Sequence, residues 1–192
     1  IILTLIIISG EIDLSIASMI ALTAVIFGTA YNAGFGMPIS MFIALFSGTL
    51  CGLFNGILVT QLQIPSIILT IGTLTLYRGI AQSLASDFSL GGYPSWFIGI
   101  DYRYIGIVPI PVIIFTVFAI VVGFFLSSTI YGKQLYLIGT NPQTAKYSGI
   151  KVDRIKLLLF TLSGLVCGIA GVLTTSRLAV ARFNMATGAE LE

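Results

Sequence analysis

The sequence is poor in charged residues and contains no histidine at all. Only 8% of its 192 residues are charged, 57% are hydrophobic, and the mean hydropathy is +1.07. A folded chain of this composition lacks the polar side chains needed to cover its surface, which excludes a soluble globular protein. The formal net charge of +2 is too small to indicate a nucleic-acid partner. The sequence therefore predicts an integral membrane protein.

Residues that catalyse reactions or bind metals are also scarce. The two cysteines, Cys51 and Cys167, lie in separate apolar runs, and we interpret both as buried thiols rather than a disulfide or metal pair. The chain has no glycine-rich phosphate loop and no serine–lysine or paired-aspartate motif of intramembrane hydrolysis. We therefore expect a protein that is not an enzyme and that has no cofactor and no metal site.

Long uncharged runs are what the sequence has instead. The longest are 64, 29 and 20 residues long, between Asp13 and Arg78, between Arg103 and Lys133, and between Lys156 and Arg177. About 20 apolar residues cross a bilayer core as a helix, and lipid offers no partner to an open strand edge. The expected fold is an all-α polytopic membrane protein, a bundle of about five to six transmembrane helices.

Glycine, proline and polar residues divide these runs into segments. An apolar run ends at residue 9, and helices are expected at residues 14–30, 39–59, 67–85, 105–130 and 157–176. We expect residues 1–192 to form a single transmembrane domain. Because the chain begins inside an apolar run without methionine, we also expect it to be a fragment that is incomplete at both ends.

The segment 131–156 is a polar island between two apolar runs. It holds six of the sixteen charged residues and five of them are Lys or Arg, whereas the polar segment 86–104 holds one cation. The positive-inside rule therefore places the island in the cytoplasm and segment 86–104 outside. The aromatic residues expected to form a belt at the outer interface are Tyr93, Trp96, Tyr102 and Tyr104.

Glycines recur every four residues in two of the expected helices. Gly48, Gly52 and Gly56 form one stripe, and Gly164 with Gly168 forms the other. Small residues at this spacing let helix backbones approach closely in lipid. The stripes predict helix packing within one subunit, with a subunit interface or a moving seam as the alternative.

Two carboxylates interrupt the first apolar region. An ionised side chain in hydrocarbon costs about 3 kcal/mol even on lenient scales, so Glu11 and Asp13 must face water, a cation or a cavity. Either they lie in a short loop at the inner interface, or a broken helix ending near Ser15 lines a transport path. Segment 188–192 is a second glycine-led acidic break and a candidate counterpart.

Arg78 ends the longest uncharged run and lies inside the helix expected at residues 67–85. Its guanidinium either reaches the outer interface or is buried against Asn55, Gln82 or an acidic partner. Hydroxyl and amide groups are frequent nearby, at Thr60, Gln63, Thr70, Thr73, Thr75 and Gln82. Neutral donors and acceptors of this kind suit a polyhydroxylated solute better than an ion.

The ordered motifs resemble the permease subunits of bacterial ABC importers for monosaccharides, the ribose-type group, which is also akin to branched-chain amino acid permeases. The segment 10–15, Gly-Glu-Ile-Asp-Leu-Ser, is similar to the family's Gly-Gly-Ile-Asp-Leu-Ser, with Glu11 in place of the second glycine. Further matching residues follow in order at 52–59, 64–65, 70–73, 78–79, 138–141, 145, 148–150, 156, 188 and 190–191.

The resemblance implies that 131–156 is a cytoplasmic coupling loop that docks on an ATPase. The expected coupling residues are Gly139, Asn141, Gln143, Thr144, Ala145, Gly149 and Ile150. The family's Glu-Ala-Ala pattern here has Gln143 for the glutamate and Thr144 for the first alanine. A short helix is expected to begin near Pro142 and to end at Gly149.

By resemblance, the expected protein is a multi-pass permease subunit of the bacterial inner (cytoplasmic) membrane that imports a monosaccharide or sugar-like solute. Its implied partners are membrane lipid, cytoplasmic ABC ATPases, an extracytoplasmic solute-binding protein and a second permease subunit, identical or related. Glu11, Asp13, Ser15, Asn55, Arg78 and Gln82 are the candidate path residues. The alternatives are an ion-coupled secondary transporter using Glu11 and Asp13, and a non-transporting membrane scaffold.

Overall fold

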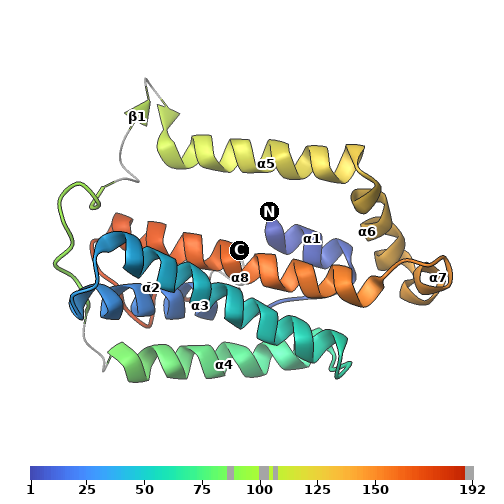
Figure 1. Cartoon of the computed structure of the whole chain (residues 1–192), viewed down its shortest axis with the longest axis horizontal. Coiled ribbons are helices and arrows are strands. Elements are labelled where there is room, and N and C mark those ends of the chain that lie inside the picture. The colour runs from blue at the N-terminus through green and yellow to red at the C-terminus, as the bar shows by residue number, and fades with distance from the viewer. Residues whose placement is uncertain (86–88, 100–103, 106–107, 189–192) are drawn as a thin grey trace.

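The computed structural model describes residues 1–85, 89–99, 104–105 and 108–188. Within these ranges the chain forms eight helices and one pair of two-residue strands (Figure 1). The helices are α1 (Ile2–Ile8), α2 (Ile16–Asn32), α3 (Met37–Thr60), α4 (Ser66–Ala85), α5 (Ile110–Ser128), α6 (Ile130–Thr140), α7 (Pro142–Tyr147) and α8 (Val152–Leu178). Strand β1 (Tyr104–Ile105) pairs antiparallel with β2 (Val108–Pro109). The predicted all-α fold is confirmed.

Four helices are long and apolar enough to cross a membrane. These are α3, α4, α5 and α8, with 24, 20, 19 and 27 residues. Helix α2 is apolar and has 17 residues, the lower limit for a span. The described residues thus hold four candidate spans, or five when α2 is counted, against the expected five to six, and the first apolar run forms only the 7-residue helix α1.

The polar island is mostly helical rather than a loop. It contains nearly all of α6, the whole of α7 and the start of α8, which begins at Val152 instead of residue 157. Asp153 lies in the first turn of α8, where a carboxylate interacts favourably with the helix dipole. Its Oδ2 also lies 3.1 Å from Lys146 Nζ. Both contacts extend α8 beyond the apolar run.

Helix α8 is the centre of the bundle. It packs against α1, α2, α3 and α7, and α4 packs on α2 and α3. Helix α5 lies apart from this group in Figure 1 and has no buried residue. The extended segment from residue 9 to residue 15 joins α1 to α2. Its Ser9, Asp13 and Ser15 are buried in the bundle, whereas Gly10 and Ile12 are exposed.

The two glycine stripes face each other where α3 crosses α8. A Cβ atom on Gly52 would lie 2.2 Å from the Phe160 carbonyl oxygen, and one on Gly164 would lie 2.1 Å from the Gly48 carbonyl oxygen. Backbones in direct contact leave no room for any side chain at these positions. The stripes therefore pack helices within this chain.

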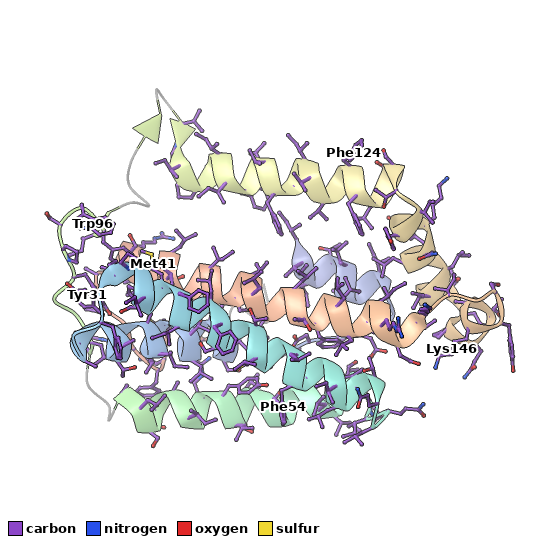
Figure 2. All side chains as sticks on the ribbon, viewed as in Figure 1. Tyr31, Met41, Phe54, Trp96, Phe124 and Lys146 are labelled. Atoms are coloured by element: carbon purple, nitrogen blue, oxygen red, sulfur yellow. The ribbon has the colours of Figure 1, made fainter. Side chains whose placement is uncertain are left out.

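The two ends of the bundle differ in chemistry. Figure 2 shows Lys146 at the α7 end and Tyr31 and Trp96 at the opposite end. Trp96 is half exposed, as an interfacial belt requires, but Tyr93 is buried and stacks on Phe27. Tyr93 therefore belongs to an internal aromatic cluster instead of the belt. Tyr102 lies outside the described residues, as does the side chain of Tyr104.

We expect Gly52→Ala to lower the free energy of unfolding by about 2 kcal/mol or more, because the added methyl group forces α3 away from α8. Gly123→Ala on α5 is the matched control, since its Cβ would meet nothing within 4 Å. Thermal unfolding in detergent measures both variants. Equal stability of the two would show that the α3–α8 crossing tolerates separation.

Candidate functional site

Helix α7 is short but capped at both ends. The Asn141 Oδ1 atom accepts hydrogen bonds from the N–H groups of Gln143 and Thr144, both at 3.0 Å. At the other end, Ile150 N–H donates to the Ala145 carbonyl and Gly149 N–H donates to the Lys146 carbonyl. This Schellman pattern needs a left-handed residue, and Gly149 has φ +81°. The helix predicted between Pro142 and Gly149 is confirmed.

Only one side of α7 packs on the rest of the chain. Ala145 is 3% exposed and joins Ile138 of α6 and Val152 of α8 in a small apolar cluster. The exposed residues of the segment include Asn141, Gln143, Thr144, Tyr147 and Gly149, and Tyr147 is 91% exposed. A protein that docks on α7 would therefore contact these exposed residues, whereas Ala145 packs α7 against its own chain.

The helices that flank α7 both contact the segment between α1 and α2. Lys156 of α8 forms an ion pair with Glu11, with only 12% and 15% of the two side chains exposed. On α6, a Cβ atom on Gly139 would lie 1.9 Å from the Ile8 carbonyl oxygen. Glu11 thus faces a cation, one of the three environments expected for it, and Gly139 makes a contact inside the chain.

Asp13 and Ser15 lie inside the bundle at the start of a buried chain of hydrogen bonds. Asp13 Oδ1 accepts from the Ser15 hydroxyl at 2.6 Å and from the Ser15 N–H at 2.9 Å. Ser15 Oγ accepts from Asn55 Nδ2 at 2.9 Å, and Asn55 Oδ1 accepts from the Tyr77 hydroxyl at 2.9 Å. Every donor in this polar chain points toward the carboxylate, so each bond polarises the next.

Helix α4 also holds the backbone of the extended segment. The Ser66 hydroxyl accepts from Ile12 N–H at 3.1 Å, and the Thr70 hydroxyl donates to the Ile12 carbonyl at 3.4 Å. These bonds replace the helical partners that the extended backbone lacks. Two buried oxygens, Asp13 Oδ2 and Ser163 Oγ, have no hydrogen-bond partner among the described residues.

The other predicted path residues lie elsewhere. Arg78 Nη1 donates to the carbonyls of Phe183 and Met185 at 2.6 and 2.9 Å, so it holds the segment that follows α8. Gln82 is exposed on α4. The acidic counterpart in 188–192 falls outside the described residues after Gly188. In the part of the chain that the structure describes, no three His, Cys, Asp or Glu side chains gather in a potential metal site.

Sequence reasoning did not single out Tyr77 or Ser66. Tyr77 reads as one more apolar residue of α4, although its hydroxyl lies 3.0 Å from the Cys51 carbonyl and 2.9 Å from Asn55. A signal was present, because Ser66, Thr70, Thr73 and Tyr77 recur at helical spacing on one face. All four are buried.

Comparison with known proteins assigns the family. A model described as the permease component of branched-chain amino acid transport systems matches residues 2–192. The chain belongs to this permease family. Members are the non-catalytic components of ABC transporters. Together with its apolar helices, this makes the chain a multi-pass protein of the bacterial cytoplasmic membrane.

Curated relatives in the permease family are autoinducer 2 import system permease proteins. LsrC of Enterobacter sp. (strain 638) is 33% identical over 190 residues, covering 98% of this chain and 55% of LsrC. LsrD of Escherichia coli O9:H4 (strain HS) is 35% identical over 191 residues, covering 95% of this chain and 57% of LsrD. The chain thus spans little more than half the length of these relatives. No solved structure matches it significantly.

A double-mutant cycle tests the buried polar chain. Tyr77→Phe is expected to cost about 1 kcal/mol of unfolding free energy and Asn55→Leu about 2 kcal/mol, because the latter leaves buried hydrogen-bonding groups unpaired. The double variant should lose about 1 kcal/mol less unfolding free energy than the sum of the losses in the two single variants. Reversible unfolding in mixed micelles gives these values.

The control for this cycle is Thr75→Val on the same helix. Its hydroxyl is exposed and donates to the Gly72 carbonyl of α4, so we expect a change within about 0.5 kcal/mol. Strict additivity of Tyr77→Phe and Asn55→Leu would mean that the two side chains do not act as one network.

Proposed function

We propose that this chain is the membrane-spanning part of an ABC importer for a monosaccharide or sugar-like solute, and that α7 is the helix on which a cytoplasmic ATPase acts. One observation carries the proposal most directly. Helix α7 is a capped, outward-facing helix whose two neighbours, α6 and α8, both contact the break between α1 and α2. The family supports the same assignment.

The charge distribution supports a cytoplasmic position for α7. Of the described cations, five lie at the α7 end: Lys133, Lys146, Lys151, Arg154 and Lys156. Three, Arg78, Arg177 and Arg182, lie toward the opposite end of the bundle, where Arg182 Nε donates to the Ser89 hydroxyl. The excess of Lys and Arg at the α7 end is typical of the cytoplasmic side.

The contacts define a route from α7 to the membrane interior. Ala145 ties α7 to α6 and α8, so a force on α7 displaces both helices. Movement of α6 would be transmitted to the Ile8 carbonyl, which Gly139 contacts. Movement of α8 would be transmitted to Glu11 through its ion pair with Lys156. Because Asp13 follows Glu11 by two residues, the displacement reaches the polar chain that joins α2, α3 and α4.

The same contacts disfavour ion coupling. A coupling carboxylate must be free to take up and release a proton or a sodium ion. Glu11 is instead paired with Lys156, which leaves only Asp13, whose buried Oδ2 has no partner among the described residues, for such a role. We therefore propose ATP-driven transport with two ATPases, a solute-binding protein and a second permease. The names of the relatives make autoinducer 2 the first solute to test, beside monosaccharides.

Tyr147→Ala tests the assignment of α7. Truncating this side chain, which is 91% exposed, should weaken ATPase association by roughly 2 kcal/mol and reduce ATP-dependent uptake, as for an anchor residue in an interface. Association is measured by co-purification with the ATPase, and uptake by reconstituting the assembled importer. Tyr136→Ala on α6, at a tyrosine that is 52% exposed, is the control and should leave both unchanged.

Uptake that continues without the ATPase but stops when the ion gradient is dissipated would overturn the importer assignment in favour of a secondary transporter. Normal uptake by the Tyr147→Ala variant would instead remove α7 as the docking helix. A protein that folds and binds the ATPase but transports none of the tested solutes would support the alternative of a non-transporting membrane scaffold.

Exchanging the charges of Glu11 and Lys156 tests the route to the interior. Each single variant, Glu11→Lys or Lys156→Glu, should lose about 2 kcal/mol of unfolding free energy, between the values for exposed and buried pairs, and should uncouple ATP hydrolysis from uptake. The double variant should regain most of both. If the exchange restores stability but not coupling, the pair is only structural.

A further inference from the structure

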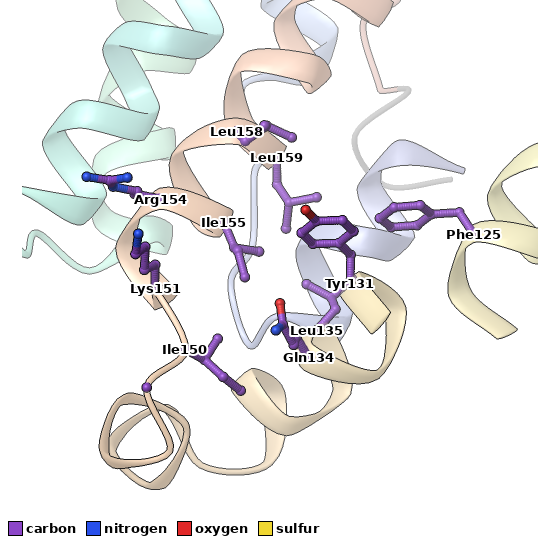
Figure 3. A pocket seen from close by; sticks show the side chains of 11 residues that line it. Phe125, Tyr131, Gln134, Leu135, Ile150, Lys151, Arg154, Ile155, Leu158 and Leu159 are labelled. Atoms are coloured by element: carbon purple, nitrogen blue, oxygen red, sulfur yellow. The ribbon is translucent and has the colours of Figure 1, made fainter. Parts of the chain in front are cut away.

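A pocket of about 600 Å³ lies between α6 and α8, next to the end of α7. Its apolar wall consists of Phe125, Tyr131, Leu135, Ile155, Leu158 and Leu159. Figure 3 shows these side chains around one hollow, with Phe125 reaching it from the end of α5. A pocket of this size is within the usual range for bound small molecules.

The apolar wall is exposed at the surface of the bundle. Tyr131 is 64% exposed and Leu158 is 57% exposed, and the Phe125 and Tyr131 rings stack with centroids 6.5 Å apart. Helix α5, which borders this side, has no buried residue and ends at Ser128. The pocket therefore lies where the apolar spans give way to the polar island. That level corresponds to the boundary between acyl chains and headgroups.

Two cations lie at the other edge of the pocket. Figure 3 shows Lys151 and Arg154 on the side away from Phe125. Both are exposed, and the ion pairs found among the described residues use Lys146 and Lys156 instead. The lining contains no Asp or Glu, and Gln134 adds a neutral amide. The surface thus offers positive charge next to an open hydrophobic wall.

We propose that this pocket binds an anionic phospholipid from the leaflet at the α7 end. The phosphate would lie against Lys151 and Arg154, and an acyl chain would cover Tyr131 and Leu158. Basic pockets between membrane helices bind anionic headgroups by this combination of charge and apolar contact. A free phosphate ion would leave the apolar wall uncovered, and a zwitterionic lipid would bring its own cation beside the phosphate and so neutralise Lys151 and Arg154 less well.

Quenching of the fluorescence of a single tryptophan by brominated acyl chains tests the proposal. Trp96→Phe removes the single tryptophan, and Tyr131→Trp places a new indole at the pocket wall. The chain is reconstituted in nanodiscs that contain acyl-brominated phosphatidylglycerol or acyl-brominated phosphatidylcholine. We expect phosphatidylglycerol to bind at position 131 about thirtyfold more tightly, the combined effect of two cations near a membrane surface.

Lys151→Gln with Arg154→Gln should abolish this preference, whereas Lys133→Gln, a cation on α6 outside the lining, should preserve it. Salt should weaken the preference because the cations are exposed. Equal quenching by the two lipids would overturn the proposal, as would loss of the preference in Lys133→Gln. Absence of quenching by either lipid would show that protein covers the wall. Competition by inorganic phosphate at constant ionic strength would assign the site to a free anion.

Discussion

The fold depends on satisfying a stretch of non-helical backbone inside a membrane protein. Between α1 and α2 the chain is extended, and lipid offers its N–H and C=O groups no partner. Ser66 and Thr70 of α4 bond to the Ile12 backbone, and the Asp13 carboxylate accepts from the Ser15 N–H. Asn55 of α3 holds the same segment through the Ser15 hydroxyl. The break therefore persists only while several helices surround it, which makes it sensitive to their movement.

The glycine contact between α3 and α8 determines which helices can surround the break. Because Gly52 and Gly164 allow backbone contact, α8 lies close enough to α2 for Thr23 to reach the Cys167 carbonyl at 3.3 Å. The same helix carries Lys156 to Glu11 at its other end. A single long helix thus joins the packed centre of the bundle to segment 131–156, and side chains larger than glycine at the crossing would push α3 and α8 apart.

The features predictable from sequence were those that depend on local pattern. Apolar runs predicted the spans, four-residue spacing predicted the glycine contact, and Pro142 with Gly149 predicted the limits of α7. Contacts between distant residues were not predictable, such as Lys156 with Glu11, which lie 145 positions apart. The polar composition of 131–156 also concealed its helices, because their apolar cluster is small, with Ile138, Ala145 and Val152 buried in it, and because α7 also depends on capping bonds from Asn141.

The structure gives Ala145, in segment 131–156, a different role from the one that the resemblance implies. The resemblance assigned the small residue Ala145 to close docking on a partner, yet this side chain is buried against α6 and α8. Its size is therefore set by packing within the chain. The two departures from the family pattern, Gln143 and Thr144, are exposed on α7. Variation at these two positions changes the surface presented to a partner without disturbing the helix, whereas variation at Ala145 would loosen α7 from the bundle.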